Sequence, residues 1–247
     1  MRKKPPTPDK KELQFVGYVQ DFPCYLDTSS GGKTSKRGGF QSERIKKDPG
    51  MANVRYNYTE MGRAAKDVKA FKQLLRPMLR QFTDTKLHQR LISLFSKLKA
   101  SDTSMDRGMR SARNGMLTKE GAALLRHYTF TIGKNLSSLL NHDIAFTTLE
   151  QFTIPNCNAH YFTLPPSATH LQLQAGVLYM DPNSMEGIFC ISEATLLPKT
   201  HEGTVTIAIP KPTLPYPLAL PIVLAKGQSI VNGSAFDTGG VVMEICL

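Results

Sequence analysis

The chain has 247 residues, 40% of them hydrophobic and 21% charged, with a net charge of +11, a composition typical of a globular protein with its own core. None of the four cysteines belongs to a C-x-x-C pair, which excludes a zinc ribbon and a redox motif and suits a reducing compartment. Because no apolar run approaches the ~18 residues that span a bilayer, and none follows the basic start, we expect a cytoplasmic protein without a membrane span.

Positive charge is concentrated in the first half of the chain. Residues 1–120 contain 26 Lys and Arg against 12 Asp and Glu, whereas residues 121–247 contain 5 against 8. The two parts therefore carry +14 and −3. A basic region attracts nucleic acid, acidic protein or an anionic surface, so this asymmetry concerns the partners of the protein.

The chain begins with a Lys/Pro-rich tail, residues 1–12, whose composition favours no regular structure. Residues 13–55 are predicted to form a β-hairpin and a basic loop. Strand-like segments lie on both sides of Asp21 and Pro23, a combination typical of a hairpin turn. A Ser/Gly/Lys-rich loop and a polar, basic segment with a Pro49-Gly50 turn complete this region.

The next region, residues 56–142, is predicted to be helical. Its clearest helix covers about residues 59–79, where apolar residues recur at helical spacing and cations occupy the other side. Pro77 is expected to kink or end this helix, and a second amphipathic helix follows Asp84 as a candidate N-cap. A polar loop and two shorter helical segments are expected at residues 101–115, 116–127 and 136–140.

From residue 143 onward, short apolar segments with period-two alternation are separated by Pro, Gly and Asn turns. Asn232-Gly233, between two apolar pairs, is a strong hairpin signal. About seven strands without intervening helices predict an antiparallel β-sandwich for residues 143–247. The expected fold class is α+β, with a basic N-terminal region of hairpin and helices followed by this C-terminal sandwich.

Motifs that carry chemistry are absent from the sequence. Residues 27–34 end in Gly-Lys-Thr like a P-loop, but Asp27 replaces the first glycine and a Gly-rich loop, not a helix, follows. The six histidines form no H-x-x-x-H or H-E-x-x-H pattern, and there is no G-x-S-x-G elbow. We therefore expect a protein that is not an enzyme, with no catalytic residues, no metal and no cofactor.

Basic residues along the polar side of helix 59–79, and in the segment before it, are candidates for binding an anionic partner. The candidates are Lys33, Lys36, Arg37, Arg44, Lys46, Lys47, Arg63, Lys66, Lys69, Lys72, Arg76 and Arg80. A merely solvated helix face is the alternative interpretation, because a charged face opposite an apolar stripe usually contacts only water. Few aromatic residues are interleaved with these cations, as single-strand binders use them. No helix-turn-helix, zinc-finger or RNA-recognition motif is present either.

Several motifs stand in a recognisable order along the chain: Gly17 with Phe22 and Tyr25, Arg37-Gly38-Gly39, residues 42–50 (SERIKKDPG), residues 60–66 (EMGRAAK), Asp106-Arg107-Gly108 and Ala168-Thr169-His170. In pattern and order they resemble an uncharacterised protein family common in Bacteroidota, over most of the chain. The resemblance implies a basic hairpin and helices followed by a β domain. It implies no catalytic residues, because the family has no assigned activity.

Two functional hypotheses follow from these patterns. The leading one is a non-enzymatic structural or interaction protein that self-assembles, through strand edges and through its oppositely charged halves. Its partner is then a second copy of the chain or another protein. The alternative is a nucleic-acid-binding protein that uses the basic helix face and the N-terminal tail.

Overall fold

The computed structural model describes residues 13–19, 22–27, 42–126, 128–133, 135–141, 144–232 and 234–246. The predicted Lys/Pro tail and the P-loop-like segment after Asp27, with Lys33, Lys36 and Arg37, lie outside the described residues. The chain divides into two compact units, residues 1–55 and 56–247.

The first unit contains the predicted hairpin, formed by β1 (Leu13–Val19) and β2 (Phe22–Asp27), which pair antiparallel with a bulge in β1. The polar segment after it is helical: α1 (Ser42–Lys47) is followed by a 3-10 turn, η1 (Pro49–Met51). Asp48 starts that turn by accepting a hydrogen bond from the Gly50 N–H at 2.8 Å. Arg55 holds the segment together by donating to the carbonyls of Ile45 and Asp48, at 2.7 and 2.8 Å.

The helices are α2 (Ala52–Leu74), α3 (Arg76–Leu79), α4 (Leu87–Ala100), α5 (Ala112–Met116), α6 (Lys119–Leu125) and α7 (Leu136–Leu140). The long helix α2 begins seven residues before the predicted start. It ends at Leu74, and α3 begins after Leu75, so the helix is interrupted just before Pro77. A helix follows Asp84 as predicted, but Asp84 is not its N-cap: Lys86 holds that position without a side-chain cap hydrogen bond, and the Asp84 carboxylate accepts from the Lys86 N–H at 2.7 Å. The predicted loop 101–115 ends earlier than expected, because Ser111 caps α5 by accepting from two backbone N–H groups.

All sheets in the second unit are antiparallel. A five-stranded sheet has the order β10-β9-β5-β6, with β7 also pairing with β5, and a three-stranded sheet has the order β3-β4-β8. Their bounds are β3 Ala145–Thr148, β4 Gln151–Asn158, β5 His170–Asp181, β6 Glu186–Ile191, β7 Thr195–Pro198, β8 Glu202–Ala208, β9 Leu218–Val231 and β10 Ser234–Ile245. The predicted hairpin at Asn232-Gly233 is confirmed, since Ser234 pairs with Val231 across a two-residue connection.

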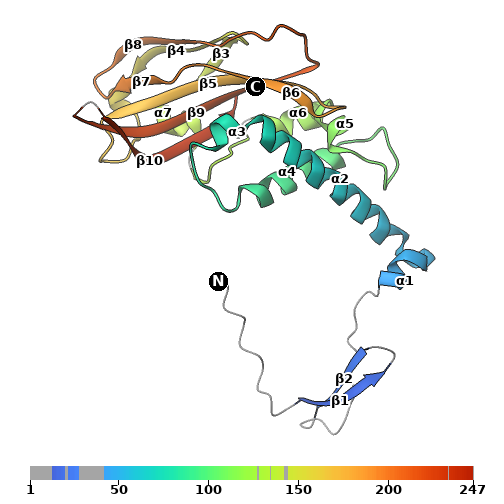
Figure 1. The fold of residues 1–247 in the computed structure, drawn as a ribbon. Coiled ribbons are helices and arrows are strands. Elements are labelled where there is room, and N and C mark those ends of the chain that lie inside the picture. The colour runs from blue at the N-terminus through green and yellow to red at the C-terminus, as the bar shows by residue number, and fades with distance from the viewer. Residues whose placement is uncertain are drawn as a thin grey trace. The chain divides into compact units, whose positions relative to one another are not determined.

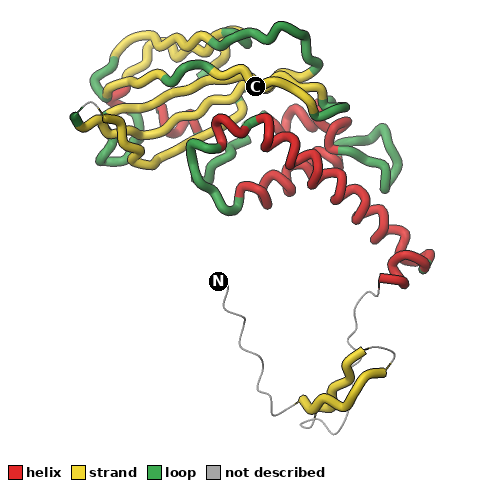
Figure 2. Tube along the Cα trace, in the orientation of Figure 1, coloured by secondary structure: helices red, strands yellow, loops and turns green. Residues whose placement is uncertain are grey.

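Within the second unit, the five-stranded sheet is covered on both faces (Figure 1). On one face, alternate residues of its strands, such as Met180, Ile222 and Met243, pack with the buried stripes of α2 and α4. On the other face, the intervening residues, such as Val177 and Val223, pack with α7 and the three-stranded sheet. Figure 2 shows the helices in red and the strands in yellow in the same orientation. The predicted α+β organisation, helices followed by antiparallel sheets, is confirmed.

The change from helices to strands takes place inside this one compact unit. Residues just before α7 lie along the outer edge of β10, where Phe130 N–H donates to the Met243 carbonyl at 2.7 Å. The helices and the large sheet therefore share a core. No helix in the described part of the chain is long and apolar enough to cross a membrane.

Candidate anion-binding groove

Four of the predicted cations meet in one groove on the outer side of α2 and α3. Along α2, residues spaced by three or four positions lie on one stripe, so that Lys69, Lys72 and Arg76 follow one another. Arg80 extends the stripe, and His88, near the start of α4, lies opposite. The groove has a volume of about 550 Å³, and its described lining is Ala65, Lys69, Lys72, Gln73, Arg76, Leu79, Arg80 and His88. We call it the basic groove.

No acidic residue is among the described residues that line the basic groove. Lys72 is half-buried and the other three cations are exposed, and none of the four forms an ion pair with a residue that the structure describes. Their positive charges are therefore not cancelled locally. A concave surface lined by one sign of charge concentrates the opposite charge from solution.

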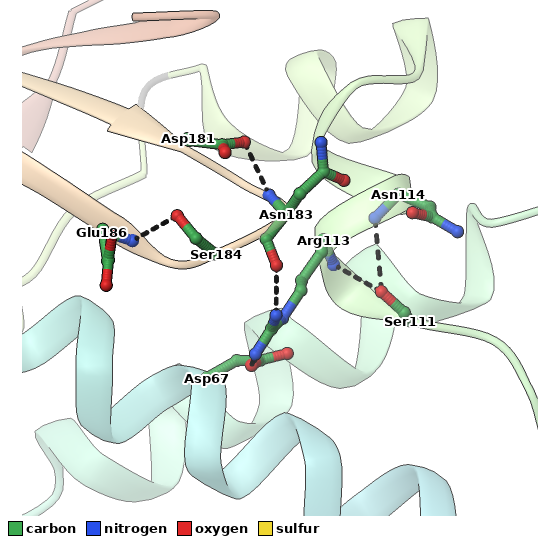
Figure 3. Close-up of polar contacts among 8 residues, drawn as sticks. All are labelled: Asp67, Ser111, Arg113, Asn114, Asp181, Asn183, Ser184 and Glu186. Atoms are coloured by element: carbon green, nitrogen blue, oxygen red, sulfur yellow. Dashed lines mark hydrogen bonds and ion pairs between the residues drawn. The ribbon is translucent and has the colours of Figure 1, made fainter.

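The carboxylate that could oppose this charge from within α2 points inward. Asp67 is 2% exposed, and its Oδ1 binds the guanidinium of Arg113, with Nη2 at 2.7 Å and Nε at 2.9 Å (Figure 3). The same guanidinium donates to the carbonyl of Asn183 in the β5–β6 turn. Asp67 and Arg113 thus join α2 and α5 to the sheet, and Asp67 is neutralised where it lies.

A second buried carboxylate of α2, Glu60, has a similar structural role. Its Oε2 lies 2.7 Å from the Lys99 Nζ, and its Oε1 accepts from the Gly108 N–H at 2.6 Å. Burial acts to raise the pKa of Glu60, but the hydrogen bonds from Lys99 and Gly108 outweigh it and hold that pKa below its ordinary value. Glu60 therefore stays ionised, and it fixes the loop that follows α4.

Asp102 organises the same loop from within. Its carboxylate is 1% exposed and accepts hydrogen bonds from Ser104, Ser111 and Asn114. Burial acts to raise the pKa of Asp102, and these hydrogen bonds together lower it further than burial raises it. Both charged carboxylates are saturated with partners, so they are structural groups and not acid–base candidates.

The structure separates Arg63 and Lys66 from the basic groove, although the sequence places all six cations on one helix side. Arg63 donates to the carbonyls of Gly108 and Met109, at 3.3 and 3.2 Å. With Lys66 it lines a different depression, of about 400 Å³, beside Ser111 and Arg113. Arg63 therefore holds the loop after α4, and Lys66 lines the depression beside that loop.

The candidate cations of the first unit differ in whether an acidic partner already occupies them. Arg44 pairs with Asp48 at 3.2 Å, an exposed contact of little strength, whereas Lys46 and Lys47 are exposed on α1. The hydrogen bond from Gly50 and the pair with Arg44 lower the pKa of Asp48. Lys33, Lys36 and Arg37 lie outside the described residues, so their role stays a prediction.

Sequence reasoning missed two polar members of the groove, Gln73 and His88. Gln73 is uncharged, so a search for cations passes over it. His88 comes from the next long helix, and only the packing of α4 beside α2 brings it to the groove. An exposed histidine near the start of a helix has no sequence pattern that would mark it.

The metal-ligating and thiol side chains of the described residues are dispersed or buried. Within the ranges the structure describes, no group of three or more His, Cys, Asp or Glu is placed to hold a metal ion. Cys157, Cys190 and Cys246 are buried, and burial raises the pKa of each thiol, so they remain protonated at neutral pH. These three cysteines therefore serve as small buried hydrophobic side chains.

Comparisons with protein-family models, with curated proteins and with solved structures found no match to this chain. The resemblance of its N-terminal motifs to a Bacteroidota family therefore stays a prediction.

Proposed function

We propose that the protein is a non-enzymatic interaction protein that binds nucleic acid through the basic groove. The observation that carries the proposal is the convergence of Lys69, Lys72, Arg76 and Arg80 on one groove without a local counter-charge. Phosphate groups along a nucleic-acid backbone are repeated single charges, which a row of cations matches. The stripe from Ala65 to Arg76 extends over about 16 Å of helix, long enough to meet several successive phosphates.

Binding of this kind has a measurable salt dependence. Each phosphate that a cation neutralises releases condensed counterions, so the logarithm of the affinity falls by about 0.7 per contact for each tenfold rise in salt for a single strand. Four contacts then predict a loss of roughly 50-fold in affinity between about 50 and about 200 mM salt. Any contribution from basic residues elsewhere in the chain adds to this slope.

The test is charge reversal within the groove. We expect the double variant Lys72→Glu/Arg76→Glu to bind a fluorescent oligonucleotide of about 12 nucleotides at least tenfold more weakly than the wild-type protein. Its salt slope should fall by about 1.4, the share of two contacts. Fluorescence anisotropy over a salt series measures both quantities.

The matched control is Lys97→Glu/Lys119→Glu, which changes the net charge equally at two exposed cations outside the groove. It should retain nearly all of the affinity if the groove is the site. Equal weakening by both double variants would assign the binding to overall charge and contradict the proposal. Circular dichroism verifies that each variant is folded.

Self-association is a second candidate function, favoured by the edge of the three-stranded sheet. β8 pairs with β4 on one side and with no strand on the other among the described residues. Its exposed positions include Thr204, Thr206 and Ala208, without the lysine or proline that natural proteins use to protect an edge strand. An edge of this kind can pair with the same edge of a second copy.

The edge gives a direct test of self-association. We expect the wild-type protein to form a concentration-dependent dimer in sedimentation velocity experiments, and Thr206→Lys to remain monomeric, because the added charge opposes edge pairing. Association through the oppositely charged halves would weaken with salt, whereas backbone pairing would not. A strictly monomeric wild-type protein at high concentration, at low and high salt, would remove this candidate.

A further inference from the structure

The basic groove does not end at Arg80. This arginine also lines a neighbouring depression of about 670 Å³, formed by the loop between α3 and α4, the segment before α7 and the first half of β10. The two hollows therefore adjoin at one cationic side chain. We call the second hollow the loop depression.

The loop depression differs from the basic groove in charge. Its two acidic residues are both paired, Asp84 with Arg90 and Asp237 with Lys226 at 3.5 Å. Asp84 is also largely buried, with 11% of its side chain exposed. Apart from Arg80, the described lining holds no other cation. A chain of phosphates would gain little there.

The remaining lining of the loop depression suits flat, partly apolar groups. Ile132 is 69% exposed, which is unusual for a large aliphatic side chain, and Phe82 and Val241 are half-buried beside it. Thr83 and Thr85 are exposed and bring hydroxyl groups that both donate and accept hydrogen bonds. Apolar surface with uncharged hydrogen-bonding groups is what a nucleobase contacts through its face and its edges.

We propose that the ligand of the basic groove is a single-stranded nucleic acid, with phosphates on the groove and unpaired bases in the loop depression. This inference rests on the proposed function and specifies its ligand. A duplex keeps its bases stacked and paired inside, so it can meet the cations but cannot place bases in an adjoining hollow. A single strand can do both, and such strands are bound without sequence preference by a cationic groove together with aromatic side chains that contact the bases, a residue type that Phe82 brings to the loop depression.

The experiment compares three probes on the full-length protein by fluorescence anisotropy and competition. The probes are a labelled single strand of about 12 nucleotides, prepared as DNA and as RNA, the duplex of the same sequence, and inorganic polyphosphate. We expect the single strand to bind at least tenfold more tightly than the duplex at about 50 mM salt. Stronger binding of the DNA or the RNA strand identifies the natural source of the ligand.

The variant Ile132→Ser removes the exposed apolar contact without changing charge. It should weaken single-strand binding roughly fivefold and leave duplex and polyphosphate binding unchanged, because those probes use the cations alone. Ile188→Ser, at an exposed isoleucine of β6 outside the depression, is the matched control and should change nothing. Both positions are exposed, so both variants are expected to fold.

The outcomes separate the two proposals. If the duplex and polyphosphate bind as tightly as the single strand, or if Ile132→Ser behaves like Ile188→Ser, the loop depression is not a base site and the inference is overturned. Nucleic-acid binding by the groove then stands, provided that Lys72→Glu/Arg76→Glu still weakens every probe. If that double variant leaves all probes unaffected, the proposed function itself fails.

Discussion

Replacing Gly115 with alanine is expected to destabilise the protein by about 3 kcal/mol or more, because α4 and α5 touch through the backbone at this residue. A Cβ at Gly115 would lie 1.8 Å from the carbonyl oxygen of Leu98, far inside any tolerable contact. Gly121 of α6 meets the Gly115 carbonyl in the same way, at 1.8 Å. The neighbouring atoms are backbone, so no side chain can move aside to make room.

Gly62→Ala is the matched control for this prediction. Gly62 lies on the exposed side of α2, and a Cβ there meets nothing within 4 Å. Alanine is the better helix former by about 1 kcal/mol, so this variant should be slightly more stable than the wild-type protein. Urea unfolding followed by circular dichroism measures both changes. If the two variants were equally stable, α4, α5 and α6 would not be in contact through the backbone of these glycines.

The periodic parts of the fold were predictable from the sequence. The apolar stripe of α2 and the Asn232-Gly233 turn depend on local spacing, which the sequence states directly. The start of α2 was not predictable, because the first residues of this helix have no buried face that would give them a periodic pattern. The end of β10 illustrates a second limit: Val242 and Met243 are both buried, since this sheet is covered on both faces, and consecutive apolar residues replace alternation there.

The candidate site was predictable only in part, for a related reason. Helical spacing places six cations on one side of the segment that forms α2 and α3, but it says nothing about what lies opposite each of them. The loop after α4 engages Arg63, whereas the packing of α4 leaves Lys72 and Arg76 beside an open groove. His88 and the whole loop depression depend on contacts between segments far apart in the chain, such as Phe82 and Val241. Such contacts are tertiary, and the local spacing of residues in one sequence does not reveal them.

Arg113→Met is expected to lower the free energy of unfolding by about 3 kcal/mol, an effect comparable to that of Gly115→Ala. Asp67 is 2% exposed and pairs with the Arg113 guanidinium, so losing that guanidinium would leave a charge buried without compensation. The Asn183 carbonyl in the β5–β6 turn would lose a donor in the same step. Most of the loss in stability thus arises from the unpaired Asp67 carboxylate. A second substitution that removes this charge should therefore restore part of the stability.

The double variant Asp67→Asn/Arg113→Met should therefore be more stable than Arg113→Met alone, because it removes the uncompensated charge. Arg107→Met, at an exposed arginine of the loop after α4, is the control for loss of a surface cation and should change stability by less than about 0.5 kcal/mol. Urea unfolding gives the coupling energy of the cycle, and hydrogen exchange shows whether the β5–β6 turn opens more often in Arg113→Met. If the effects of the two substitutions are additive, Asp67 and Arg113 do not join α2, α5 and the sheet. The apolar core alone would then hold the helices that form the basic groove.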